Sequence, residues 1–333
     1  SATNINNIID KFDVANGSTL TLSYSQFNGH TGVGTGVLKL SDTSLTGTQI
    51  KSVNDASTNA IDLTNVTTIS TATMAEMLEI VNNTGATFTT AANYAVTISD
   101  IASPTDINKV LADTTGVVTA TVSADTASNL NSALTNATST DALTLTITDT
   151  SLSSLTNLLA LDTKTSLAVN ASSITSITET YANLNTAYSS AGISGLGNEA
   201  VTITDTQSAT NVNTILGKTT GVVTATVSAD TASNLNSALT NATSTDALTL
   251  TITDTSLSSL TNLLALDTKT SLAVNASSIT SITETYANLN TAYSSAGISG
   301  LGNEAVTITD TQSATNVNII LGATSGNVTA IVT

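Results

Sequence analysis

The chain has 333 residues, enough for two or three ordinary domains or one elongated domain. It contains no cysteine, no tryptophan and one proline, and its seven basic residues, all lysines, stand against 24 acidic residues, giving a net charge of −17. This balance excludes the basic face that a nucleic-acid-binding protein needs, and the lack of cysteine excludes a disulfide framework. No apolar run reaches the length of about 18 residues that a membrane-spanning helix requires.

The N-terminal region predicts strands followed by a helix. Residues 18–44 (STLTLSYSQFNGHTGVGTGVLKLSDTS) alternate apolar and polar positions around a glycine-rich turn, so residues 1–60 are expected to be β-rich. Residues 61–113 are expected to be diverged repeats of the type described below, with an amphipathic helix over 71–85. The apolar face of that helix would hold Met74, Met77, Leu78 and Val81. The region is therefore either a β-rich cap or a set of diverged repeats.

A long identical repeat follows. Residues 114–213 match residues 219–318 without a difference, at an offset of 105 residues, and a third copy begins near Gly326. We therefore divide this part into a first copy (114–218), a second copy (219–323) and the start of a third (324–333). A long period that subdivides into similar shorter segments is typical of solenoid proteins.

Each copy contains four shorter segments with one pattern: an alternating apolar run, a polar corner and a helical run, at steps of 25, 22, 34 and 24 residues. In one segment Leu143, Leu145 and Ile147 lie on one strand face. Helical stripes would follow at Leu152, Leu155, Leu158 and Leu159, and in the next segment at Ile174, Ile177, Tyr181, Leu184 and Tyr188. Strands separated by helices must be parallel and joined by right-handed crossovers. The sequence therefore predicts an α/β solenoid of stacked strand–helix repeats, with one parallel sheet on one side and helices on the other.

The segment LTNLLALDTKTSLAVN (Leu155–Asn170) resembles the pattern of leucine-rich repeats, which implies a coil of that kind. The other segments have no recurring asparagine ladder, so only the fold is carried over and no function of that family.

Aspartates recur at the corners between predicted strands and helices. Two interpretations are open: they cap helices, Asp149, Thr150 or Ser151 capping the helix that follows, or stacked corners form a calcium-binding row. The row consists of Asp100, Asp125, Asp149, Asp205, Asp230, Asp254 and Asp310.

Threonines alternate with the apolar strand residues and are predicted to point away from the core. They are Thr119, Thr121, Thr144, Thr146, Thr202 and Thr204. Stacked repeats would align them into a face that resembles that of β-solenoid ice-binding proteins. The alternative is an ordinary solvated sheet face, since threonine favours strands, and Ala168 and Asn170 interrupt the array.

Catalytic chemistry finds little support in the sequence. His30 is the only histidine and lies in a predicted loop, which leaves neither a Ser-His-Asp triad nor a transition-metal site. The glutamates are predicted to lie on the surface: Glu76, Glu79, Glu179, Glu199, Glu284 and Glu304. We therefore expect no enzyme and no cofactor other than calcium; an enzyme would have to use the N-terminal region, with Glu76 or Glu79.

The acidic, cysteine-free, Thr/Ser/Ala/Asn-rich units with VTITDT and LTLTITDTS runs resemble repeat regions of very large bacterial cell-surface proteins, the adhesins, surface-layer and haemolysin-like proteins of cyanobacteria and other aquatic bacteria. The resemblance implies export to the cell surface and a spacer, adhesive or lattice-forming role.

Two functions are expected from these observations. The first is an extracellular structural protein whose repeats stack into a rod, filament or surface layer, with other copies of itself as partners. The second is an adhesin that binds surface glycans or ice through its threonine-rich face.

Overall fold

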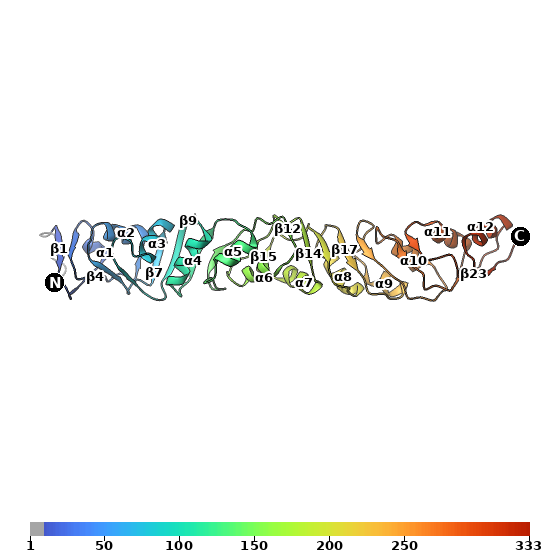
Figure 1. Cartoon of the computed structure of the whole chain (residues 1–333), viewed down its shortest axis with the longest axis horizontal. Coiled ribbons are helices and arrows are strands. Elements are labelled where there is room, and N and C mark those ends of the chain that lie inside the picture. Colours follow the sequence, from blue (N-terminus) through green and yellow to red (C-terminus); the bar gives the residue numbers. More distant parts are fainter. Residues whose placement is uncertain (1–9) are drawn as a thin grey trace. The chain divides into compact units, whose positions relative to one another are not determined.

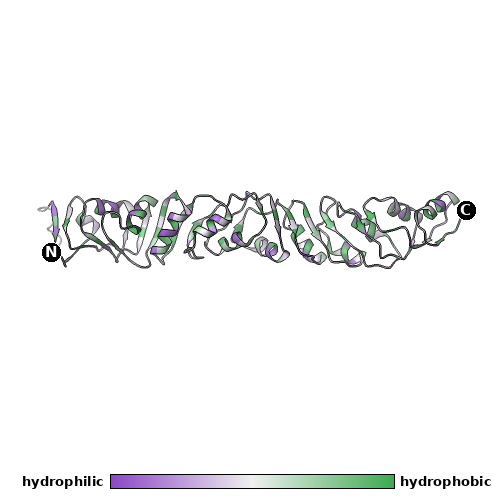
Figure 2. Cartoon of the chain, viewed as in Figure 1, coloured by the Kyte–Doolittle hydropathy of each residue, from purple (hydrophilic) through white to green (hydrophobic). Residues whose placement is uncertain are grey.

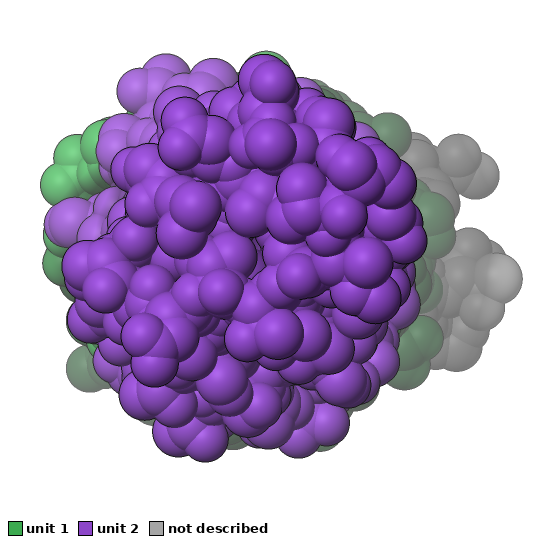
Figure 3. All heavy atoms as spheres, turned by 90° about the vertical axis from the view of Figure 1, so that its right-hand side faces the viewer, with its two compact units in different colours: residues 1–149, 156–173, 191–195 green, residues 150–155, 174–190, 196–333 purple. Residues whose placement is uncertain are grey.

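The computed structural model describes residues 10–333, and within them short strands and helices alternate along the chain (Figure 1). All strand pairs between these elements are parallel. The chain divides into two compact units (Figure 3). Unit 1 comprises Ser1–Asp149, Thr156–Ser173 and Ala191–Gly195, and unit 2 comprises Thr150–Leu155, Ile174–Ser190 and Leu196–Thr333.

Unit 1 contains the first six helices and most of the first fifteen strands. The helices are α1 (Tyr24–Phe27), α2 (Gly47–Asp55), α3 (Met74–Val81), α4 (Pro104–Asp113), α5 (Ala127–Ala133) and α6 (Thr156–Asp162). The strands are β1 (Lys11–Val14), β2 (Thr19–Leu22), β3 (Thr31–Gly34), β4 (Val37–Leu40), β5 (Ser44–Leu45), β6 (Ala60–Leu63), β7 (Thr68–Ala72), β8 (Phe88–Thr90), β9 (Ala95–Ala102), β10 (Val118–Val122), β11 (Ala142–Thr144), β13 (Val169–Asn170) and β15 (Ile193–Ser194).

Unit 2 contains the remaining elements. Its helices are α7 (Tyr181–Ser189), α8 (Ala209–Leu216), α9 (Ala232–Ala238), α10 (Thr261–Asp267), α11 (Tyr286–Ser294) and α12 (Ala314–Ala323). Its strands are β12 (Ser151–Leu152), β14 (Ser176–Glu179), β16 (Ala200–Ile203), β17 (Val223–Thr226), β18 (Ala247–Thr249), β19 (Ser256–Leu257), β20 (Val274–Asn275), β21 (Ser281–Glu284), β22 (Ile298–Ser299), β23 (Ala305–Ile308) and β24 (Val328–Thr329).

The predicted repeating strand–helix arrangement is confirmed, but the prediction of one sheet on one side is wrong. Unit 1 has two larger parallel sheets, β2-β4-β6-β8 and β5-β7-β9-β10-β11, and unit 2 has β12-β14-β16-β17-β18 and β19-β21-β23-β24. In the N-terminal part the chain forms a strand of one sheet, a strand of the other and then a helix, as in β4, β5 and α2. Polar corners such as Ser41–Thr43 break each extended run into these two strands.

Alternating residues of the strands form the core, as the period of two predicts. Leu143, Leu145 and Ile147 are completely buried, whereas Thr144 is exposed. The hydropathy colouring shows such apolar segments recurring on strands and helices throughout both units (Figure 2). Each fully buried leucine or isoleucine contributes roughly 1.5–3 kcal/mol, so the core is the main source of stability.

Two helices begin later than predicted. Leu152 lies on β12 and pairs with Ile177 on β14. Both residues are buried, but they are strand residues and do not belong to the predicted helical stripes. Helix α6 begins at Thr156 and buries Leu158 and Leu161. The serine and threonine residues around Leu152 permit a short strand, and pairing with the next repeat decides the conformation.

The first 60 residues were expected to be β-rich, but the described part of them, residues 10–60, contains two helices as well as strands. Ser23 and Thr46 each begin a capping box, in which their side chains accept from Gln26 and Gln49 while those glutamines bind the cap backbone. This S/T-x-x-Q signal is visible in the sequence and identifies helix starts. The predicted helix over 71–85 is confirmed as α3, with Met74 and Met77 buried. Its third buried residue is Ile80, whereas Leu78 and Val81, which were predicted on the apolar face, are half-buried.

Successive repeats bury each other's apolar residues, as a comparison of identical positions in the two copies shows. Leu216 is 7% exposed, but its identical counterpart Leu321, which no later repeat covers in this structure, is 51% exposed. Val227 and Val332 show the same contrast, at 4% and 52%. A repeat thus completes the core of the repeat before it.

Candidate functional site

Most of the predicted aspartates bind the helix of the preceding repeat. Asp149 accepts a 2.7 Å hydrogen bond from the backbone N–H of Ala127, the first residue of α5. The same contact, at 2.6–2.9 Å, joins Asp100 to Met74, Asp205 to Tyr181, Asp254 to Ala232 and Asp310 to Tyr286. A carboxylate in this position satisfies a free N–H group and interacts favourably with the helix dipole. The expectation that Asp149 caps the following helix is therefore wrong.

One further aspartate, Asp42, belongs to this set and was not among the predicted residues. Asp42 accepts a 2.7 Å hydrogen bond from the N–H of Tyr24, which begins α1. The spacing in the sequence could have identified these contacts, because each of these aspartates follows the residue it caps by 18–26 residues, which is about one repeat.

Asp125 and Asp230 instead bind the start of their own helices, next to the threonines that cap them, Thr126 and Thr231. Asp125 accepts from the N–H of Thr126 at 2.7 Å and from the side-chain amide of Asn129 at 2.8 Å, and Asp230 repeats both contacts in the second copy. The helix that precedes Asp125, α4, begins at Pro104, which has no N–H group to cap.

The geometry supports helix capping for the aspartate row. Among residues 10–333, no three histidine, aspartate or glutamate side chains lie close enough together to hold a metal ion. The hydrogen bond from the Tyr286 N–H lowers the pKa of Asp310 below its ordinary value. The pKa of Asp125 is lowered by the amide of Asn129 and the N–H of Thr126. Both carboxyls are thus stabilised as anions by N–H donors.

Two glutamates make a related contact. Glu179 accepts a 3.0 Å hydrogen bond from the N–H of Leu155, just before α6, and a 2.8 Å bond from its neighbour Thr180. Glu284 repeats this arrangement with Leu260 in the second copy. Burial acts to raise the pKa of Glu179, but the hydrogen bonds outweigh it and the pKa is lowered.

A lysine from the next repeat holds the other end of α5. Lys164 Nζ donates to the carbonyl oxygens of Asn131 and Leu134, both at 2.8 Å. Burial lowers the pKa of this ammonium group. A cation favours the helix C-terminus as an anion favours the N-terminus. Helix α5 is therefore held between Asp149 and Lys164, and α9 is held in the same way by Asp254 and Lys269.

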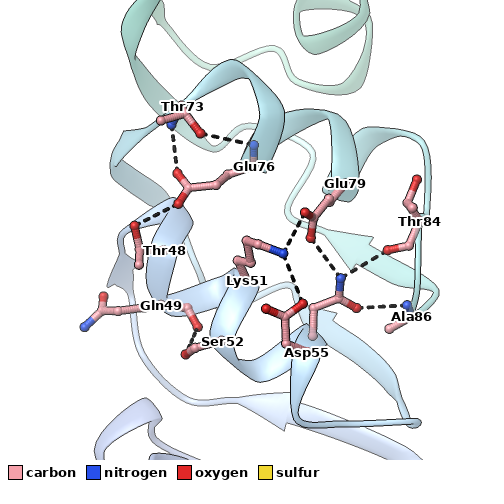
Figure 4. A network of polar contacts seen from close by, with 11 residues as sticks. Thr48, Gln49, Lys51, Ser52, Asp55, Thr73, Glu76, Glu79, Thr84 and Ala86 are labelled. Atoms are coloured by element: carbon pink, nitrogen blue, oxygen red, sulfur yellow. Dashed lines mark hydrogen bonds and ion pairs between the residues drawn. The ribbon is translucent and has the colours of Figure 1, made fainter.

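The densest charged cluster lies on α2 and α3 in unit 1 (Figure 4). Lys51 points between Glu79, at 2.9 Å, and Asp55, at 3.0 Å. Glu76 accepts from the hydroxyl of Thr48 at 2.8 Å and closes the capping box at the start of α3. The two glutamates that an N-terminal enzyme would have to use are thus bonded to neighbouring helices.

The expectation that the glutamates lie on the surface is wrong for Glu199 and Glu304, which are completely buried. Glu199 accepts from the hydroxyl of Tyr188 and from the N–H groups of Gly197 and Asn198 at 2.8 and 3.1 Å. Burial raises the pKa of Tyr188, and the Glu199 carboxyl adds to the effect. Together they fasten the glycine-rich loop before β16.

The predicted threonines face away from the core. Thr119, Thr121, Thr144 and Thr204 are exposed, and Thr146 and Thr202 are half-buried. In unit 2 Thr202 lies between Thr178 and Thr224 on neighbouring strands, and Ala247 ends this row. The same three-threonine row recurs 105 residues later as Thr283, Thr307 and Thr329.

His30 lies between α1 and β3, as predicted for a loop, and its ring centroid is 5.1 Å from that of Phe12. Along the described part of the chain, none of the helices has the length and apolar character needed to cross a membrane. No protein-family model matches the chain, and no curated protein or solved structure is significantly similar to it.

Proposed function

We propose that the chain is a non-enzymatic, extracellular structural protein of a bacterial cell surface. In this proposal its strand–helix repeats stack as an α/β solenoid and form a rod, a filament or an element of a surface layer. The observation that carries the proposal is that each repeat completes the one before it, through the Asp149 and Lys164 contacts to α5 and their counterparts on α9.

The identical copies support this proposal. A cleft built for catalysis needs one irregular arrangement of groups, whereas here the same contacts recur 105 residues apart. Repetition of an interface favours a function in which the number of repeats matters more than any one residue.

The surface chemistry supports an exposed, extracellular location. A net charge of −17 keeps an extended array soluble, and the lack of cysteine makes its stability independent of redox conditions. Electron microscopy of the purified protein, with and without calcium, tests the assembly directly. Ordered filaments or sheets are expected, and isolated short particles under all conditions would overturn self-assembly.

A second candidate function is adhesion to glycans or ice through the threonine rows. The row Thr178, Thr202 and Thr224 favours it because these hydroxyls lie on adjacent parallel strands at a regular spacing. Replacing Thr202 and Thr307 by valine keeps the strand shape and removes the central hydroxyl of each row. If adhesion uses this face, the double variant should no longer bind glycan-coated or ice surfaces, and its filament formation should be unchanged. Unchanged binding by the double variant would contradict this function.

A further inference from the structure

A hollow of about 630 Å³ opens in unit 1 between residues 111–116, at the end of α4, and residues 136–141, before β11. Its polar side chains come from Asp113, Thr114, Thr115, Asn136, Thr138, Thr140 and Asp141. The corresponding hollow in unit 2, between residues 216–221 and 241–246, has only about 100 Å³. The loop sequences differ at two positions, Ala112 against Gly217 and Asp113 against Lys218.

The outer wall of both hollows is held in the same way. Asp141 accepts from the N–H of Val118 at 3.0 Å and from the N–H of Thr138 at 2.9 Å. The side chain of Asn108 accepts from the N–H of Asn136 at 2.8 Å. The second copy repeats these bonds with Asp246, Val223, Thr243, Asn213 and Asn241. A different wall therefore does not explain the different volumes.

One methyl group contributes to the difference. In unit 2 the side-chain amide of Asn241 donates to the carbonyl of Asn213 at 3.2 Å and lies against Gly217. A Cβ atom on Gly217 would stand only 2.9 Å from that amide nitrogen. In unit 1 the position is Ala112, and within residues 10–333 the amide of Asn136 makes no corresponding bond. Ala112 thus keeps this hollow open.

The open hollow has the size and chemistry of a ligand site. Its volume lies within the roughly 300–1,000 Å³ range of small-molecule pockets, and its counterpart lies below that range. The Asn136 amide offers a donor and an acceptor. The hydroxyls of Thr114, Thr115 and Thr138 already donate to Tyr94, Ala92 and Asp141 and offer a ligand their acceptor side. Asp113 accepts from Thr90 and Tyr94 through one carboxylate oxygen, and its other oxygen can accept from a ligand. No basic side chain lines the hollow, so an anionic ligand is disfavoured.

We propose that the hollow in unit 1 binds a neutral or amine-bearing saccharide, whose vicinal hydroxyls pair with Asn136, Asp113 and the surrounding threonines. A smaller hollow of about 270 Å³ shares Ala112 and Asp113 and extends toward Asn82 and Lys109, which gives room for a second sugar ring. The ammonium group of Lys109 is paired with Asp106 at 2.8 Å. This inference goes beyond stacking and does not depend on it, since the site lies within one unit.

The test measures binding of neutral and amino monosaccharides, and of their short oligomers, to the full chain. Ligand-observed NMR detects which sugars bind, and calorimetry gives the affinity and the number of sites. Binding of at least one sugar is expected at one site per chain. Asn136→Ala should weaken it roughly three- to tenfold, since a sugar hydroxyl would lose its hydrogen-bond partner. Asn241→Ala is the matched control, the same change in the same local sequence, and should alter the affinity less than about twofold.

Two further variants test the methyl group itself. Ala112→Gly removes no polar group, yet it should weaken binding by closing the hollow, with folding checked by circular dichroism. The double change Gly217→Ala with Lys218→Asp recreates the open hollow in unit 2 and should give two sites per chain. Lack of binding by every sugar, equal losses in Asn136→Ala and Asn241→Ala, or no second site in the double variant would overturn the proposal. None of these outcomes bears on filament formation, which is tested separately by electron microscopy.

Discussion

Single carboxylates connect each repeat to the one before it. Asp149 reaches back 22 residues to the first N–H of α5, and its copy Asp254 does the same for α9. An ordinary cap comes from the same helix, so its loss destabilises that helix alone. A cap supplied by the next repeat couples the two, because the helix is complete only when its neighbour is folded.

Asp149→Ala should reduce the free energy of unfolding by about 1 kcal/mol, the usual effect of losing a side-chain cap at a helix N-terminus. Denaturant unfolding followed by circular dichroism measures it. Thr148→Ala, which changes an exposed neighbour without a capping role, serves as the control. Asp149→Ala combined with Asp254→Ala should double the loss, since the two sites are separate; a loss no larger than that of Thr148→Ala would contradict the role.

Acid should destabilise the protein. The pKa of Glu179, of Glu284 and of Asp310 is lower in the folded chain than in a free side chain, so the folded state binds fewer protons. The stability they contribute is present above the unfolded pKa and is lost as the pH falls through the folded pKa, below about pH 5. Urea midpoints measured from neutral pH downward should decrease over this range.

The combination of Glu179→Gln and Glu284→Gln tests the assignment of this effect. These amides keep the shape but do not titrate, so the decrease of the urea midpoint in acid should be smaller than in the unchanged chain. A midpoint that rises on acidification, or an unchanged pH dependence in the double variant, would refute the account.

At the scale of elements, a glycine between the end of a helix and the next strand lets the backbone lie close to the preceding repeat. A Cβ atom on Gly221 would stand 2.2 Å from the carbonyl oxygen of Glu199, and Gly116 and Gly326 meet Tyr94 and Glu304 at similar distances. The helix-to-strand passage therefore packs backbone directly against the preceding repeat.

Gly221→Ala should lower the free energy of unfolding by about 1–3 kcal/mol, the cost of overpacking where backbone must move. Gly322→Ala is the matched control, because it lies in α12 with no atom within 4 Å of an added Cβ. That change should be neutral or should stabilise by up to about 1 kcal/mol through helix propensity. Thermal unfolding compares the two, and equal effects would show that Gly221 has no packing role.

The sequence predicted the elements better than their connections. The alternation at Leu143, Leu145 and Ile147 identified a strand with its buried face, since period two depends only on local residues. The short strand at Leu152 was missed because its pairing with Ile177 lies 25 residues away. The direction of capping by Asp149 was missed for the same reason, because a local pattern cannot distinguish its own helix from that of the preceding repeat.

At the scale of the whole molecule, we expect the stability to be a sum over repeats and the contacts between neighbouring repeats. The two copies have the same sequence over 100 residues and the same helix caps. Removing one copy should therefore remove that copy's contribution to the free energy of unfolding and leave the other copy's contribution unchanged. Deleting residues 219–323 joins Lys218 to Thr324. Thr324 donates to the carbonyl oxygen of Glu304 as Thr219 donates to that of Glu199, so Thr324 can take the place of Thr219 at the new junction.

The measurement that tests this claim most directly is equilibrium urea unfolding of the chain without residues 219–323, compared with the full chain. The shortened chain should fold, retain its circular dichroism per residue, and show an m-value smaller by about one third, in proportion to the surface removed. It should also be less stable. A shortened chain that fails to fold, or one with unchanged stability and m-value, would show that the copies do not act as stacked, neighbour-completing repeats.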